Sequence, residues 1–316
     1  MPLNPQVEKI IYGAQRSATP AFPALGAKLA RIAYEKAIVS VDIAPVPMYQ
    51  VSDLAVELAG RTLTVRQYAS REHSWAEPMP ALLFFHGGGF TIGSVDTHDR
   101  LCRMLAHGAD CLVYSLDYRL APEHRFPAAA DDAFDTLGWL DREALSLGVD
   151  PARIAVGGDS AGGTLAAACA LHARDIGMPL VLQMLIYPGL SAWQDTDSHK
   201  RLTHGYLLDA EVIQWFFSQY LRSDADRDDW RFAPLMAPSL ARVAPAWIAL
   251  AEYDPLVDEG LAYAQRLRSA GVPATSIVYE GMIHSFFQHG GLVPKAREAH
   301  AQACLALRAA YRQAQS

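Results

Sequence analysis

The 316-residue sequence contains few cysteines and no block of like charge. Its four cysteines form no C-x-x-C pair and no metal-ligand spacing, so neither a disulfide framework nor a zinc site is expected. We expect reduced, buried thiols in a cytoplasmic protein. The net charge of −7 is spread along the chain, which argues against a nucleic-acid partner.

Long hydrophobic runs are also missing. The longest apolar stretches, such as 165–171 and 180–187, are well short of the roughly 20 residues that cross a membrane. Residues 1–9 lack both a basic start and an apolar core, so no secretory signal is expected. The sequence therefore predicts no membrane span and leaves open whether the protein is a monomer or a homodimer.

Hydrophobic residues make up 51% of the chain, which is ample for a large core. Strand patterns alternate with helical ones, and this alternation predicts an α/β fold with a mostly parallel sheet covered by helices on both faces. The first two strands, joined by a short turn at 59–61, are expected to form an antiparallel hairpin at the edge. The strands are expected at 51–58, 62–68, 81–85, 111–116, 153–157, 180–187, 246–251 and 274–279, and the helices at 97–107, 128–147, 161–176, 259–270 and 294–312.

Two stretches do not fit this alternation. Residues 1–45 have helical periodicity but precede the sheet, and residues 190–240 separate two strands by far more than a crossover needs. Within the second stretch, 209–221 has the pattern of an amphipathic helix rich in aromatic residues. We expect both stretches to form a helical cap over the carboxyl edge of the sheet, with 46–189 and 241–316 as the core.

Residues 158–163 read G-D-S-A-G-G between the apolar run 153–157 and a helix-forming stretch. A serine between glycines at a strand-to-helix turn is the G-x-S-x-G nucleophile elbow. Side chains at Gly158 and Gly162 would collide with backbone in such a sharp turn. The strained turn exposes the Ser160 hydroxyl, and the helix directs its positive N-terminal end toward the same place. The pattern therefore predicts a nucleophile beside a site for an oxyanion.

Three consecutive glycines follow the expected strand 81–85, in the run His86-Gly87-Gly88-Gly89-Phe90. Bare backbone N–H groups at the carboxyl end of a central strand are typical of an oxyanion loop. We expect Gly88, Gly89 and Ala161 to be the donors. His86 is interpreted as orienting the backbone of this loop, and a merely flexible turn is the alternative.

The base must come from eleven histidines. His284 follows the last expected strand after a short loop, so it should lie at the same sheet edge as the serine. His289, in a glycine-flanked turn, and His300, in a helix expected to be exposed, are the rivals. Position favours His284, because an exposed serine needs a base that removes its proton as it attacks.

The acid that orients the base is expected at the end of the preceding strand, where three carboxylates occur. Asp258 is interpreted as the N-cap of the following helix, and Glu252 as a brace for the loop. Asp254 is therefore the best candidate. The resulting order, Ser160 then Asp254 then His284, is the nucleophile–acid–histidine order of the α/β-hydrolase fold.

Together these motifs resemble the hormone-sensitive-lipase-like esterases, or bacterial esterase family IV, of the α/β-hydrolase superfamily. The resemblance spans residues 86–286 and rests on six motifs: HGGGF at 86–90, DYRLAPE at 117–123, FPAAADD at 126–132, GDSAGG at 158–163, DPLVD at 254–258 and HSF at 284–286. It implies hydrolysis of carboxylic esters with short to medium acyl chains, without a cofactor. Metal-dependent hydrolysis is not expected, because no cluster of His, Asp and Glu has the spacing of metal ligands. Amidase or lactonase activity and a receptor that has lost catalysis remain the alternatives.

The resemblance also concerns residues around the site. It implies that Glu123 is a supporting carboxylate near the site, whereas the residues alone equally indicate a buried ion network with Asp117 and Arg119. Asp159 resembles the subgroup with Asp before the serine and is interpreted as bracing the elbow. Four apolar side chains are expected either to line the substrate pocket or to pack the cap: Phe90, Leu208, Trp215 and Phe216.

Overall fold

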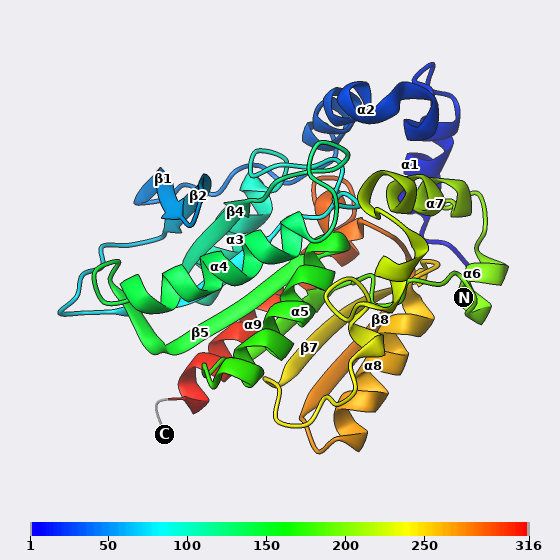
Figure 1. Ribbon diagram of the computed structural model, residues 1–316. Helices are drawn as coiled ribbons and strands as arrows, with labels where there is room; N and C mark the ends of the chain where they lie inside the picture. The colour runs from blue at the N-terminus through cyan, green and yellow to red at the C-terminus, as the bar shows by residue number, and fades with distance from the viewer. Residues whose placement is uncertain (1, 315–316) are drawn as a thin grey trace.

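The computed structural model describes residues 2–314, and within them the chain forms one eight-stranded sheet (Figure 1). The strand order is β1-β2-β4-β3-β5-β6-β7-β8. β1 and β2 form an antiparallel hairpin, β2 runs antiparallel to β4, and the remaining neighbours are parallel. The strands are β1 Gln50–Leu58, β2 Arg61–Ala69, β3 Met79–Phe85, β4 Leu112–Asp117, β5 Val149–Asp159, β6 Leu182–Ile186, β7 Ala246–Tyr253 and β8 Ala274–Ile283. The predicted α/β fold, the eight strands and the edge hairpin are confirmed.

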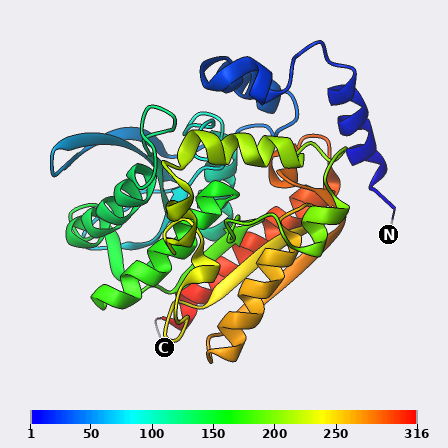
Figure 2. The same ribbon diagram turned by 45° about the vertical axis from the view of Figure 1, so that its right-hand side comes forward.

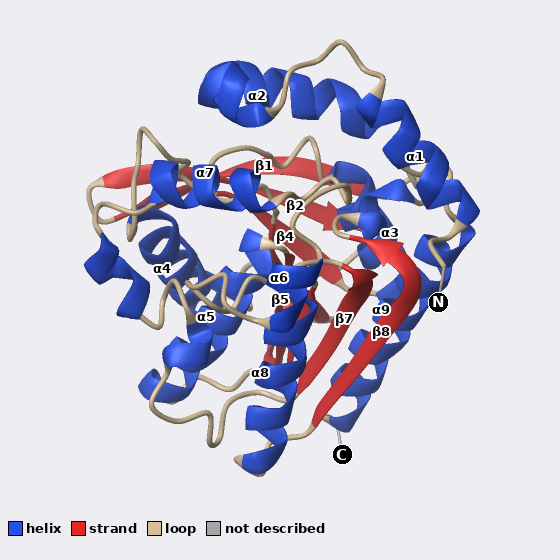
Figure 3. Cartoon of the chain, turned by 90° about the vertical axis from the view of Figure 1, so that its right-hand side faces the viewer, coloured by secondary structure: helices blue, strands red, loops and turns tan. Residues whose placement is uncertain are grey.

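Helices cover both faces of this sheet, as the alternation predicted. Figure 3 shows α4, α5 and α8 on one side and α3 and α9 on the other. Every residue of the central strand β3 is buried, which explains its uninterrupted apolar sequence. The five helices are α3 Asp99–Ala109, α4 Ala128–Glu143, α5 Ala161–Ile176, α8 Val257–Ser269 and α9 Pro294–Gln313.

The two stretches outside the alternation are helical and lie together. α2 and α7 run side by side above the carboxyl ends of the strands (Figures 1 and 2). The Phe22 ring of α2 packs against Trp215 and Phe216 of α7 at centroid distances of 6.4 Å. The division into core and cap stays a prediction, and its residues 1, 315 and 316 lie outside the described part of the chain. These elements are α1 Pro5–Gln15, α2 Phe22–Val39, α6 Asp197–Arg201 and α7 Ala210–Tyr220, with short 3-10 turns at Asp224–Asp228 and Pro234–Met236. A third 3-10 turn, Phe286–His289, lies between β8 and α9.

Residues 2–314 contain no paired cysteines, no membrane-spanning helix and no metal-binding cluster. The four cysteines are buried and unpaired, as expected. No helix in this part of the chain combines the length and the apolarity that a membrane crossing requires. No cluster of three or more His, Cys, Asp or Glu side chains is arranged there to hold a metal ion. The cytoplasmic location stays a prediction.

Candidate active site

Ser160 occupies a sharp turn between β5 and α5. Its backbone lies at φ 54° and ψ −120°, a strained conformation for a residue with a side chain. A Cβ at Gly158 would meet the backbone of Gly162, and a Cβ at Gly162 would meet the carbonyl group of Phe85. Both positions therefore require glycine, as the sequence predicted, and the Ser160 N–H donates to Ile186 O at 2.9 Å to hold the turn.

The three residues predicted to act together lie in one hydrogen-bonded chain. His284 Nε2 is 2.9 Å from Ser160 Oγ, and His284 Nδ1 is 2.7 Å from Asp254 Oδ2. Asp254 is fully buried, and its other oxygen, Oδ1, accepts from Leu256 N at 2.9 Å. Because the Asp254 carboxylate accepts a hydrogen bond from Nδ1–H of His284, the Nε2 atom of the same ring is free to accept the serine proton.

The glycine loop after β3 faces this serine. Gly87 N donates to Asp159 Oδ1 at 2.9 Å, which fixes the loop against the elbow, and a Cβ at Gly87 would collide with that carboxylate. Gly88 and Gly89 have φ values of 120° and 57°, which favour glycine. In the described part of the chain, the N–H groups of Gly88, Gly89 and Ala161 donate to no protein acceptor, and the three residues line the same cavity as the serine.

Two predicted supporting residues lie behind the loop. His86 is buried, stacks on Tyr118 at a centroid distance of 4.2 Å, and places Nδ1 2.8 Å from Gly87 O. Burial lowers the pKa of His86 to about 3, so the neutral ring donates Nδ1–H to that carbonyl group. Asp159 is also buried and contacts His98 Nε2 at 3.0 Å.

The two rival histidines are both buried. Burial lowers the pKa of His289 and of His300 to about 4. The expected exposure of His300 is wrong, because its face of α9 packs inward and its Nε2 lies 2.7 Å from Phe287 O. Glu252, interpreted as a brace, accepts from Gly281 N at 2.7 Å and so links the ends of β7 and β8.

The expectations for Glu123 do not fit the structure. Its side chain is 54% exposed, is not part of the cavity wall, and pairs with Arg31 of α2 at 2.6 Å. The alternative of one buried network is also wrong: Asp117 is exposed, and Arg119 pairs instead with Asp132 at 2.8 Å. Glu123 therefore fastens an N-terminal helix to the core and does not support the serine.

Asp258 is not an N-cap. Helix α8 begins one residue earlier, at Val257, so Asp258 lies in its first turn. Its carboxylate accepts from Ser198 N at 2.7 Å and thereby holds the short helix α6 against α8. The pairing with a segment 60 residues away could not be inferred from the local helix-start pattern.

A cavity of about 890 Å³ lies in front of the serine. Phe90, Leu208 and Phe216 line it, whereas Trp215 is not among its lining residues and packs on Phe22 and Phe216 instead. The prediction of a pocket position therefore fails for Trp215 alone, because it projects from a different side of α7. Other apolar lining residues are Leu207, Val212, Ile213, Phe217, Phe232 and Leu256.

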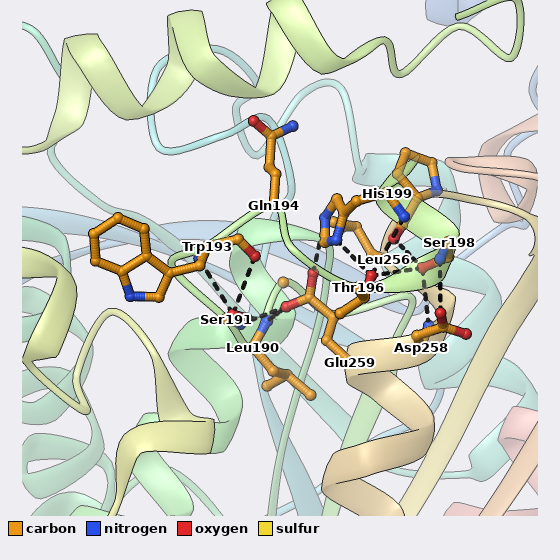
Figure 4. A network of polar contacts seen from close by, with 12 residues as sticks. Leu190, Ser191, Trp193, Gln194, Thr196, Ser198, His199, Leu256, Asp258 and Glu259 are labelled. Carbon is orange, nitrogen blue, oxygen red and sulfur yellow. Dashed lines mark hydrogen bonds and ion pairs between the residues drawn. The ribbon is translucent and has the colours of Figure 1, made fainter. Parts of the chain in front are cut away.

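Sequence reasoning missed several polar residues close to the site. His98 and Gln288 are fully buried, and their side chains meet at 2.7 Å behind the glycine loop. Glu259 and His199 line the cavity itself and form the network in Figure 4. None of these residues belongs to a spacing pattern, and Glu259 looks like an ordinary acidic residue in the first turn of a helix.

Comparisons with known proteins show which family the chain resembles. A family model described as alpha/beta hydrolase fold matches residues 82–288. The chain is 40% identical over 306 residues to an ethyl acetate hydrolase of Pseudomonas putida, covering 94% of this chain and 96% of that protein. It is 44% identical over 270 residues to the carboxylic ester hydrolase LipN of Mycobacterium tuberculosis, covering 82% and 71%.

Solved structures give the same picture. An ester hydrolase from the metagenome of Lake Arreo superposes with a TM-score of 0.93 at 36% identity, covering 97% of this chain and 98% of that one. The esterase of Pyrobaculum calidifontis superposes with a TM-score of 0.90 at 37% identity, covering 98% and 99%. The chain therefore belongs to the hormone-sensitive-lipase-like carboxylesterases of the α/β-hydrolase family.

Proposed function

We propose that the protein hydrolyses carboxylic esters with short to medium acyl chains, using Ser160 as nucleophile, His284 as base and Asp254 as the orienting acid. The observation that carries the proposal is the chain of two hydrogen bonds, of 2.9 and 2.7 Å, that joins the three side chains. A hydroxyl, an imidazole and a buried carboxylate in this order make an activated nucleophile.

The reaction proceeds in two steps. Ser160 Oγ attacks the ester carbonyl carbon while His284 Nε2 takes its proton, and Asp254 balances the charge of the imidazolium. His284 then protonates the leaving alcohol, which leaves an acyl group on the serine. A water molecule, deprotonated by the same imidazole, attacks the acyl carbon, releases the acid and restores the serine hydroxyl.

The negative oxygen that forms in both steps needs hydrogen-bond donors. We assign this task to the N–H groups of Gly88, Gly89 and Ala161, which donate to no acceptor in the described part of the chain. Ala161 is the first residue of α5, so the helix N-terminus adds a positive potential there. Losing one such donor costs roughly 2.7–4 kcal/mol of transition-state stabilisation in enzymes of this kind.

The cavity wall is mostly apolar, and its volume of about 890 Å³ is ordinary for a small-molecule pocket. The preference for short esters is supported by the similarity to an ethyl acetate hydrolase. An amidase or lactonase with the same residues would differ in turning over anilides or lactones faster than matched esters.

The experiment is an assay of p-nitrophenyl esters from acetate to dodecanoate, with Ser160→Ala as the variant. We expect a maximum between acetate and octanoate, and a loss of kcat on the order of 10⁶ in the variant. Ser146→Ala, in an exposed loop, is the matched control. A folded Ser160→Ala protein that retains a tenth of the activity would refute the assignment. Failure of a fluorophosphonate to label Ser160 would favour the non-catalytic receptor.

A further inference from the structure

One part of the cavity wall is polar although most of the wall is apolar. Glu259, from the first turn of α8, and His199, from α6, line the cavity and are 1% and 5% exposed. Buried acidic and imidazole groups normally have partners for all their polar atoms. The proposed ester hydrolysis gives these two side chains no role.

Among residues 2–314, only one oxygen of the Glu259 carboxyl group has hydrogen-bond partners. Oε2 accepts from Leu190 N at 2.5 Å and also from Ser191 N. Oε1 lies 3.6 Å from His199 Nε2, which is farther than a hydrogen bond. Figure 4 shows the carboxyl group between the backbone of Leu190 and Ser191 and the His199 ring.

The other side of the His199 ring is fixed. Nδ1 lies 2.7 Å from Thr196 Oγ1, which also accepts from His199 N at the start of α6. The ring therefore cannot turn freely, and Nε2 is held beside Glu259 Oε1. In the described part of the chain, neither of these two atoms takes part in a hydrogen bond.

Both groups favour their neutral forms. Burial raises the pKa of Glu259 to about 8 and lowers the pKa of His199. A neutral carboxyl group and a neutral imidazole that face one cavity can each offer or accept one hydrogen bond. A substrate hydroxyl has the same dual character, since it donates one hydrogen bond and accepts others. An anionic group would instead be repelled by the nearby carboxylate of Asp254, which already raises the pKa of Glu259.

We propose that Glu259 Oε1 and His199 Nε2 form a binding site for a hydroxyl group of the substrate, so that the preferred esters carry a hydroxyl in addition to the ester bond. The inference rests on the proposed ester hydrolysis at Ser160 and names its substrate class. The alternative is that Glu259 serves only to anchor the loop at Leu190 and Ser191, through Oε2.

The hydroxyl can lie in either half of the ester, so the test has two arms. In the acyl arm, kcat/KM for p-nitrophenyl butyrate is compared with that for its 2-hydroxy and 3-hydroxy derivatives. In the alcohol arm, butyl butyrate is compared with 4-hydroxybutyl butyrate. We expect the wild-type protein to prefer the hydroxyl ester by about tenfold in one arm, because a site built for a hydroxyl discriminates against the analogue that lacks it.

The variants decide which groups create the preference. His199→Phe keeps a planar ring without polar atoms, and Glu259→Gln keeps the shape and an oxygen for the two backbone N–H groups. We expect His199→Phe to reduce the preference to about twofold or less and Glu259→Gln to reduce it partly. The matched controls are His204→Phe and Glu211→Gln, at exposed positions of the same insertion, and both should keep the wild-type preference.

The readout is a ratio of two substrates in one preparation, so a change in the amount of folded protein cancels. Fluorophosphonate labelling of Ser160 checks that each variant has an intact site. The inference is overturned if the wild-type protein prefers the hydroxyl ester by less than twofold in both arms. It is equally overturned if the preference survives in both variants. Absence of any butyrate hydrolysis in the wild-type protein would instead contradict the proposed function.

Discussion

The cavity contains two histidine–carboxyl pairs that differ in how they are connected. In the first, His284 Nδ1 lies 2.7 Å from Asp254 and Nε2 lies 2.9 Å from Ser160. In the second, His199 Nε2 lies 3.6 Å from Glu259. The first pair is closed, because both ring nitrogens have hydrogen-bond partners in the protein. We call the second pair open, because within residues 2–314 neither His199 Nε2 nor Glu259 Oε1 takes part in a hydrogen bond, and both residues line the cavity.

The difference follows from which carboxyl oxygen the backbone occupies. Asp254 uses Oδ1 for one backbone N–H, of Leu256, and turns Oδ2 toward its histidine. Glu259 uses Oε2 for two backbone N–H groups and leaves Oε1 beside an imidazole that is out of hydrogen-bond range. The same two residue types therefore make a catalytic base in one place and, by our inference, a ligand contact in another.

Removing the imidazole of each pair should have the most different effects on catalysis. His284→Ala is expected to reduce kcat for p-nitrophenyl butyrate by about 10⁴-fold or more, because the serine loses its base. His199→Ala removes no group from the proton-transfer chain, so its loss should be at least 100-fold smaller. Steady-state kinetics of both purified variants measures this difference. Equal losses would mean that the two pairs act as one unit.

Changing the buried carboxylate of the closed pair should have the next largest effect. Asp254→Asn keeps the side-chain volume but offers an amide to His284 Nδ1, which favours the wrong tautomer. We expect kcat to fall by about 10⁴-fold, as for the corresponding change in a serine protease triad, with KM changed little. A control is Asp258→Asn, whose carboxylate holds α6 and lies outside the hydrogen-bonded chain. A loss of less than tenfold in Asp254→Asn would contradict its role.

The closed pair could be predicted from the sequence and the open pair could not. Ser160, Asp254 and His284 each follow a strand of a parallel sheet, so the order of elements alone brings them to one edge. Gly158 and Gly162 marked the turn, because only glycine fits its geometry. Such features can be predicted because each depends only on residues that are close together in the sequence.

The contacts that sequence reasoning missed or misjudged all join distant segments. Glu259 meets the loop at Leu190 about 70 residues away, and Glu123 meets Arg31 of an N-terminal helix. Such pairs depend on where the 190–240 insertion and the first 45 residues come to lie. Neither hydrophobic periodicity nor motif spacing predicts these positions. For the same reason, the sequence does not predict which side of α7 faces the cavity, and therefore that Trp215 does not line it.

The Glu259 carboxyl group should also make the stability of the protein depend on pH. The pKa of Glu259 is raised to about 8 in the folded protein, above its ordinary value of 4.5. Its favourable contribution is therefore complete below about pH 4.5 and is lost as the pH rises to about 8. Glu259→Gln has no such titration, so the stability of the wild-type protein relative to this variant should fall by up to about 4 kcal/mol from pH 5 to pH 9. Urea unfolding of both proteins at several pH values tests this, and a constant difference would contradict it.

The smallest effect is expected from replacing Thr196, the residue that holds the His199 ring in place. Thr196 caps α6 and keeps the His199 ring from turning, through the contact of 2.7 Å between Oγ1 and Nδ1. Thr196→Val keeps the shape but removes this oxygen, which should destabilise the protein by about 1 kcal/mol. It should also lower the preference for hydroxyl esters two- to fivefold, because a ring that can turn no longer presents Nε2 to the cavity. Thr196→Ser restores the oxygen and should restore both properties. If Thr196→Val lowers the melting temperature but leaves the preference at the wild-type value, the contact with Thr196 is not what orients His199 for binding.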